Sequence, residues 1–248
     1  MSNLLVKDQH GVRWIFFNRP EKLNALTRED IRDAHRRVQE ASEQGLDAIV
    51  FRGMGERSFS AGVHVESFRN LSTAEARELI SELRGLLDAV RTSPLPTVSA
   101  INGYCIGGAM ELAMACDIRI AVTHARFGMP EIKVGIPSVL DAALLQQHIG
   151  LSKAKEMLLT GDLYGVEEMD KYGLINQVVE PHALDEAVER MLQRITVHSK
   201  AAIRSQKRLF EVWQNTTLQE SINASVNEFA LVFGEEETRK AVEKYVKK

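Results

Sequence analysis

Two adjacent glycines and a glutamate within Ile101–Asp117 have the types and spacing of an oxyanion site beside a proton-transfer group. The segment reads as a short strand, a turn and a helix that starts at Gly107 and Gly108. Unpaired N–H groups at a helix start favour negative charge, and Glu111 lies on the same helix face as Gly108. One helical turn could therefore hold an oxyanion and move a proton. The alternative is a tight strand-to-helix turn in which an arginine neutralises a partly buried glutamate.

A second glycine-bearing turn follows a different strand. Asp47–Phe51 and Thr97–Ile101 are apolar runs typical of buried parallel strands. The first leads into the small-residue loop Gly53–Gly62 and the turn Ser60–Val63, and the second leads toward Gly107. Ligands of open α/β sheets usually bind where strands end. The two turns together predict a site more strongly than either alone, although the loop could also be a mere connection.

The remaining patterns predict an α/β region followed by helices only. A hairpin of Leu4–Lys7 and Val12–Asn18 opens the chain, and Thr27 caps the helix after it. The segment Ala125–Ile136, which carries a second acid, is irregular, and no strand pattern appears after Val179. Further helices are predicted at Val139–His148, Ser152–Thr160, Val166–Tyr172, Leu184–Val197, Lys200–Gln214, Leu218–Val232 and Glu235–Lys248.

The composition excludes several classes of protein. With 44% hydrophobic and 26% charged residues, the 248-residue chain resembles an ordinary globular protein, and its net charge of −3 indicates no nucleic-acid or anionic-membrane surface. No run approaches the ~18 apolar residues of a membrane span, and the N-terminus lacks the pattern of a signal or transit peptide. Cys105 and Cys116 resemble small buried hydrophobes, and the histidines share no metal-ligand spacing. We expect a cytoplasmic protein with no metal, no nucleic-acid partner and no membrane partner.

Six segments carry a pattern that spans nearly the whole chain. They are FNRPEKLNAL (Phe17–Leu26), FSAG (Phe59–Gly62), INGYCIGGAMELAMACDIRIA (Ile101–Ala121), FGMPEIKVGIP (Phe127–Pro137), LTGDLYGVEEMDKYGLINQVV (Leu159–Val179) and FGEEETRKAVEKYVKK (Phe233–Lys248). In this order and spacing they resemble the crotonase superfamily, also called the enoyl-CoA hydratase/isomerase family.

The resemblance implies an α/β fold in which a spiral of ββα units surrounds a core sheet and a C-terminal α-helical region mediates trimerisation. The expected division is a spiral core domain of residues 1–195 and a helical oligomerisation region of residues 196–248. Members of the family often form dimers of trimers. We therefore expect a homotrimer or a hexamer.

The resemblance also implies a substrate class and a mechanism. Family members bind acyl-CoA thioesters and stabilise an enolate at the thioester oxygen with two backbone N–H groups, which by position are those of Val63 and Gly108. The hydratases add two glutamates that hold and activate water, and the matching residues are Glu111 and Glu131. Coenzyme A is part of the substrate, so no separate cofactor is expected.

The CoA moiety is implied to bind two segments, around residues 22–26 and 61–65, and in some members the last helix of a neighbouring subunit reaches it as well. The implied substrate and CoA positions are Lys22, Leu23, Ala25, Ala61, Val63, His64, Val65, Gly108, Tyr245 and Lys248.

The chain departs from the usual hydratase pattern at two places. His64 stands where hydratases usually have aspartate, and it is either a surface or supporting histidine or a group that binds an acyl substituent or a CoA phosphate. The segment Pro137–Leu144 replaces a glycine-rich stretch, which makes Ser138 and Asp141 candidate specificity residues. Asp141 is either an extra acid or substrate-binding group, or an early helix position favoured by the helix dipole.

The leading prediction is an enoyl-CoA hydratase, a hydro-lyase that adds water to a 2-enoyl-CoA. The runner-up is an enoyl-CoA isomerase with Glu131 as its chief base, because a double-bond shift needs only one group that takes and returns a proton. A crotonase-type decarboxylase or thioesterase follows, because the segment after Pro137 is altered. Retention of both glutamates favours hydration. A non-catalytic RNA-binding homologue would be expected to carry a basic element, which the net charge of −3 does not suggest.

Overall fold

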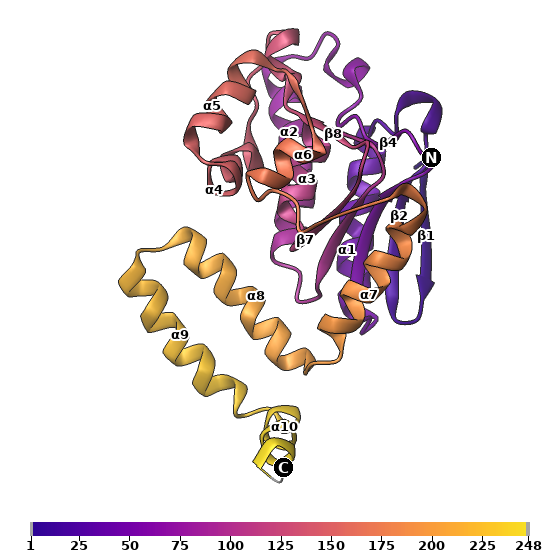
Figure 1. The fold of residues 1–248 in the computed structure, drawn as a ribbon. Coiled ribbons are helices and arrows are strands. Elements are labelled where there is room, and N and C mark those ends of the chain that lie inside the picture. Colours follow the sequence, from indigo (N-terminus) through magenta and orange to yellow (C-terminus); the bar gives the residue numbers. More distant parts are fainter. Residues whose placement is uncertain (1, 247–248) are drawn as a thin grey trace.

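The larger of two sheets forms the centre of the fold in the computed structural model, which describes residues 2–246 (Figure 1). Its strands are β1 (Leu4–Gln9), β2 (Val12–Phe17), β3 (Ala48–Gly53), β5 (Thr97–Ile101), β7 (Ile118–Val122) and β10 (Gln177–Val179). They lie in the order β1-β2-β3-β5-β7-β10, with β1 antiparallel to β2 and every other neighbouring pair parallel. The central strands β3 and β5 are almost wholly buried, which is why they read as apolar runs.

A second sheet lies where the sequence indicated only loops. Its strands are β4 (Ser58–Ser60), β6 (Tyr104–Ile106), β8 (Arg126–Gly128) and β9 (Leu163–Gly165), in the order β4-β6-β8-β9. The loop prediction for Gly53–Gly62 and the irregular prediction for Ala125–Ile136 were therefore wrong at β4 and β8. Strands of three residues show no periodicity in the sequence, and tertiary pairing decides their conformation.

Two long helices cover the sheet and begin with side-chain caps. In α1 (Arg28–Glu43) the Thr27 hydroxyl accepts from the Asp30 N–H and Asp30 accepts from the Thr27 N–H, as predicted for a cap at Thr27. The other, α2 (Thr73–Arg91), buries its leucine stripe beside α1. The remaining helices of this region are α3 (Gly108–Ala115), α4 (Leu145–Ile149), α5 (Leu151–Thr160), α6 (Val166–Lys171) and α7 (Leu184–Thr196), with 3-10 turns η1 (Pro20–Lys22), η2 (Val65–Phe68), η3 (Pro130–Val134), η4 (Leu140–Leu144) and η5 (Pro181–Ala183).

The predicted helix Val139–His148 is not one continuous α-helix. Its first half is the 3-10 turn η4 and only its second half is α4. Leu140 has a left-handed φ of 50°, which an α-helix cannot contain. The chain therefore turns sharply here, and this turn lies beside α3.

Three helices follow the sheets and project away from them (Figure 1). They are α8 (Lys200–Asn215), α9 (Leu218–Val232) and α10 (Glu236–Val246), with α8 and α9 packed side by side. Lys207 of α8 pairs with Asp117 at 2.5 Å and so ties the helices to the sheet region. The predicted division between residues 195 and 196 falls at the end of α7, and it stays a prediction. The large exposed apolar side chains of this region are Phe210, Trp213, Leu218, Ile222, Val226, Phe229, Leu231, Phe233, Val242 and Val246.

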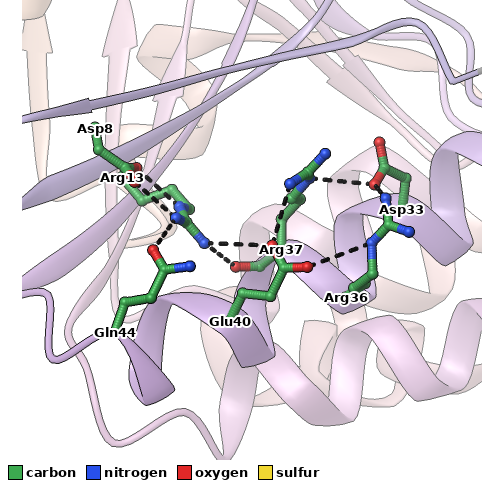
Figure 2. Close-up of polar contacts among 7 residues, drawn as sticks. All are labelled: Asp8, Arg13, Asp33, Arg36, Arg37, Glu40 and Gln44. Carbon is green, nitrogen blue, oxygen red and sulfur yellow. Dashed lines mark hydrogen bonds and ion pairs between the residues drawn. The ribbon is translucent and has the colours of Figure 1, made fainter.

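A buried arginine on β2 fixes the N-terminal hairpin to α1 (Figure 2). Arg13 donates to both carboxylate oxygens of Asp8, at 2.8 and 2.7 Å, and this hydrogen bonding lowers the pKa of Asp8. It also donates to the backbone oxygen of Arg37 at 3.0 Å and to the Gln44 side chain at 2.7 Å. The other residues of the cluster are Asp33, Arg36 and Glu40. These contacts give the buried guanidinium its partners, and we assign the cluster a structural role.

Candidate active site

A cavity of about 210 Å³ opens at the N-terminus of α3. Val63, Gly108, Glu111, Glu131 and Ser138 are among its lining residues. Most of the remaining wall is apolar, and it is formed by Val65, Phe68, Ile80, Leu83, Ile106, Val134, Ile136, Pro137 and Val139. The structure thus brings residues from four separate segments of the sequence to one largely apolar chamber with a few polar groups, which is the usual form of a small-molecule site.

The backbone N–H groups of Val63 and Gly108 are both placed to serve this chamber. Around the parallel bridge between Leu26 and Val63, the Leu26 N–H donates to Gly62 and the His64 N–H donates to Leu26, each at 2.8 Å. This alternation directs the intervening N–H of Val63 away from Leu26. Gly108 is the first residue of α3, so its N–H has no acceptor within the helix.

The two turns that carry these N–H groups touch each other. A methyl group on Gly62 would lie 3.0 Å from the Gly108 nitrogen, and one on Gly108 would lie 3.4 Å from the Val63 side chain. Gly107 has a φ of 58°, and a methyl group there would lie 2.5 Å from Glu131 Oε1. The glycines therefore allow both the turn and the close approach of the second carboxylate.

Glu111 is a buried acid with a strongly perturbed pKa. Its side chain lies in the first turn of α3 and the residue is 3% exposed. Burial, together with the charges of Glu131 and Asp141, raises its pKa to about 8, although the backbone N–H of Ala142 opposes the shift. Within residues 2–246 Glu111 has no ion-pair partner, so the arrangement with a neutralising arginine is not the one observed.

Glu131 lines the same chamber but is less buried than Glu111. It is half-buried in η3, and its Oε1 lies against Gly107. The hydroxyl of Ser138 donates to its Oε2 at 2.8 Å, which orients the carboxyl group. Two carboxyl groups with unequal burial face one chamber, and such a pair can present one acid and one base.

Because the carboxyl group of Glu111 is buried, we expect its removal to stabilise the protein by an amount that depends on pH. In the unfolded chain Glu111 ionises near its ordinary pKa of 4.5, whereas the folded protein keeps it protonated to about pH 8. The folded state holds the extra proton in this interval, so stability falls as the pH rises across it and levels off above about pH 8.

Glu111→Gln cannot ionise and should escape this loss. We expect its melting temperature to exceed that of the unmodified protein by an amount that is small near pH 5, grows by several degrees toward pH 8, and then stays constant, as measured by circular dichroism. Glu186→Gln, at an exposed glutamate of α7, is the matched control. A difference independent of pH would contradict the buried, protonated state of Glu111.

The two candidate specificity residues of the altered segment lie in different places. Ser138 lines the chamber and contacts Glu131. Asp141 is buried in η4 behind the chamber wall, where it pairs with Arg91. Val63 and Val65 line the chamber while His64 between them is half-buried and, among the described residues, is not part of the lining.

The two segments implied to bind CoA are hydrogen-bonded to each other. The Ala61 N–H donates to the Leu23 oxygen at 2.9 Å, next to the Leu26–Val63 bridge. Lys22 is exposed at the end of η1, whereas Ala25 is buried. Tyr245 belongs to α10, but its side chain lies outside the described part of the structure, and Lys248 lies outside the described residues altogether.

Sequence patterns did not identify the groups outside the chamber that act on Glu111 and Asp141. The Ala142 N–H and Arg91 are recognisable only once η4 is placed against α2 and α3. Ile80 of α2 also lines the chamber, and no motif of the sequence indicated it.

Comparisons with known proteins all point to one family. The enoyl-CoA hydratase/isomerase family profile matches residues 7–248. The chain is 29% identical to a crotonyl-CoA hydratase of Syntrophomonas wolfei, covering 100% of this chain and 96% of the relative. It is 27% identical to a short-chain-enoyl-CoA hydratase of Clostridium acetobutylicum, with the same coverage. A crystal structure of enoyl-CoA hydratase from Bacillus anthracis superposes with a TM-score of 0.93 at 25% identity, covering 99% of this chain and 96% of the other.

The fold is therefore the crotonase fold, an α/β spiral with the site at the start of α3. The chain belongs to the enoyl-CoA hydratase/isomerase family, which confirms the resemblance drawn from the sequence. In the part of the chain that the structure describes, no helix is long and apolar enough to cross a membrane, and no cluster of three or more potential ligands forms a metal site.

Proposed function

We propose that this protein is an enoyl-CoA hydratase that adds water across the double bond of a 2-enoyl-CoA. The observation that carries the proposal is the presence of two carboxyl groups, Glu111 and Glu131, in one chamber beside the N–H groups of Val63 and Gly108. The hydratase names of the full-length relatives support the same reaction. Coenzyme A enters as part of the substrate, so the reaction needs no separate cofactor.

In this mechanism the two N–H groups bind the thioester oxygen and stabilise the charge that it gains in the enolate. A water molecule held between the carboxyl groups bonds through its oxygen to C3 while one carboxylate removes a proton from it. The other carboxyl group gives a proton to C2, and the pair ends with one proton, as it began. Glu111, whose pKa is about 8, holds a proton at neutral pH in the free protein, so an acid is available at the start.

The arrangement of the chamber also supports a particular substrate shape. Its acyl-facing wall is formed by side chains such as Phe68, Ile80 and Val134, and Ser138 is already engaged by Glu131. An uncharged hydrocarbon acyl chain fits this wall, because the lining lysine, Lys133, already pairs with Asp162 at 3.0 Å and a polar acyl substituent would lose its hydration.

A panel of acyl-CoA thioesters tests the proposal. We expect conversion of short 2-enoyl-CoA substrates to 3-hydroxyacyl-CoA products that exceeds double-bond migration from 3-enoyl-CoA, decarboxylation of a carboxyacyl-CoA and release of free CoA. Predominant migration would assign the protein as an isomerase, and predominant release of carbon dioxide or CoA would assign it as a decarboxylase or thioesterase.

We also propose that the protein works as a homotrimer or a dimer of trimers. The exposed apolar side chains of α8, α9 and α10 support this, because a patch of this kind is typical of an interface. Light scattering is expected to give three or six chain masses, and replacement of exposed Phe229 by lysine is expected to lower that mass. A monomeric unmodified protein would contradict the proposal.

We place the protein in the cytoplasm, and the buried free thiols of Cys105 and Cys116 are consistent with a reducing compartment.

A further inference from the structure

One guanidinium group lies among carboxylates from three elements behind the chamber. Arg91 is the last residue of α2, and its side chain is 20% exposed. It pairs with Asp141 of η4 and with Asp88 one turn earlier in α2, and its Nε lies 3.6 Å from Glu211 Oε1 of α8. A single cation therefore joins the segment after Glu131 to the C-terminal helices.

Asp141 depends on this cation. It is 8% exposed, and burial raises its pKa while the hydrogen bond from Arg91 lowers it. Among the described residues its second oxygen, Oδ2, is buried without a hydrogen-bond partner, and Arg91 supplies its ion pair. Loss of the guanidinium would leave a buried and unpaired acid, which is costly.

The residue after Asp141 contacts the active site directly. The backbone N–H of Ala142 closes the turn of η4 on the Val139 oxygen at 3.0 Å, and η4 packs against α3, where this N–H lies close enough to Glu111 to oppose the rise of its pKa. The charge of Asp141 itself acts on Glu111. The position of η4 therefore sets both the donor and the negative charge that Glu111 experiences.

The other charged groups near Glu111 and Asp141 belong to η3, to α2 and to the lining of a neighbouring cavity. Glu111 faces Glu131 of η3 as well as Asp141 and Ala142 of η4. Asp88 of α2 also acts on Asp141. The remaining titratable groups beside Arg91 line an adjacent cavity, and they are Asp117, Arg119, His148, Lys207 and Glu211. Of these, Lys207 pairs with Asp117 and Arg119 donates to backbone oxygens, so both cations are engaged elsewhere.

We propose that Arg91 and Asp141 form a positioning pair for Glu111, which holds η4 against α3 so that the Ala142 N–H stays beside the carboxyl group. Through Glu211 the same pair connects the active site to α8 of the C-terminal region. Asp141 is then neither an extra acid nor a group that contacts substrate. The kinetic part of this inference rests on the proposed hydratase function, whereas its structural part does not.

Kinetics of matched variants test the pair. We expect R91M to lower kcat for crotonyl-CoA about tenfold, through displacement of Glu111, with KM changed less than about twofold. Adding D141N to R91M removes the same tie from its other end, so the double variant should be no slower than R91M, whereas R91K should restore part of the lost kcat. R84M is the control, because Arg84 also belongs to α2 and pairs with Asp88 but is 71% exposed. A wild-type kcat in R91M, or a double variant slowed well beyond R91M, would overturn the proposal.

A thermal measurement tests the same coupling without any assay of activity. The difference in melting temperature between the unmodified protein and E111Q grows over a pH interval that the pKa of Glu111 sets. D141N removes a negative neighbour, so this interval should move to lower pH. An unmoved interval would overturn the coupling. If the unmodified protein does not hydrate crotonyl-CoA, the proposed function fails, and the thermal measurement still decides the role of the pair.

Discussion

Glu131→Gln is expected to lower the turnover of crotonyl-CoA by about 10²-fold or more, because an amide can neither take a proton from water nor return one. The carboxyl group lies against Gly107 at the oxyanion turn and is oriented by Ser138, so the amide can occupy the same space. We expect normal folding and little change in KM. Stopped-flow or steady-state loss of the conjugated thioester absorbance measures the effect.

Glu111→Gln should produce a loss of similar size, which separates hydration from isomerisation. A double-bond shift needs one proton-transfer group, and hydration as proposed uses both. Glu186→Gln in α7 is the control with the same chemical change at an exposed site. Unchanged turnover in either active-site variant, with the control also unchanged, would rule out the two-carboxylate mechanism.

Gly62→Ala is expected to lower turnover by about 10²-fold, the usual cost of losing one oxyanion donor. Gly62 has a φ of 79°, and a methyl group there would lie 2.6 Å from the Ile106 oxygen and 3.0 Å from the Gly108 nitrogen. Both contacts are with backbone, so the strand end or the start of α3 must move. The Val63 and Gly108 N–H groups would then no longer converge on one oxygen.

Gly55→Ala provides the matched control for this change. Gly55 has a φ of 77°, and the nearest atom to an added methyl group is Pro20 Cβ at 3.4 Å, an ordinary contact. It should therefore carry a comparable backbone cost without displacing the oxyanion turn. Melting temperatures of the two variants report that cost. Equal turnover in both would contradict the assignment of the donors.

The main sheet was largely predictable from the sequence, whereas the second sheet was not. The strand prediction Thr97–Ile101 coincides with β5, because three β-branched residues and two small ones lie between turn signals and all five are buried. The last strand, β10, begins only at Gln177, since Leu174 and Asn176 bond to α6 and β7 before the pairing of β10 begins. The four short strands of the second sheet carry no such pattern, and their partners lie far away in the sequence.

The site could be predicted as a list of residues but not as an arrangement. Glycine turns after buried strands indicated Gly108 and the segment before Val63, and the family resemblance added Glu131. The roles of Ser138 and Asp141 depended on the left-handed turn at Leu140, which local propensity does not reveal. This turn directs Ser138 to Glu131 and places Asp141 on Arg91. Tertiary contacts thus give different roles to Ser138 and Asp141, which the sequence presented together as candidate specificity residues.

The most direct test of the proposed function is incubation of the purified protein with crotonyl-CoA in water enriched in oxygen-18, followed by mass spectrometry of the thioester. The mechanism built on Val63, Gly108, Glu111 and Glu131 predicts 3-hydroxybutyryl-CoA with one heavy oxygen at C3, and a large loss of this product in Glu111→Gln and Glu131→Gln. An unlabelled isomeric enoyl-CoA, or free CoA with a labelled acid, would contradict it.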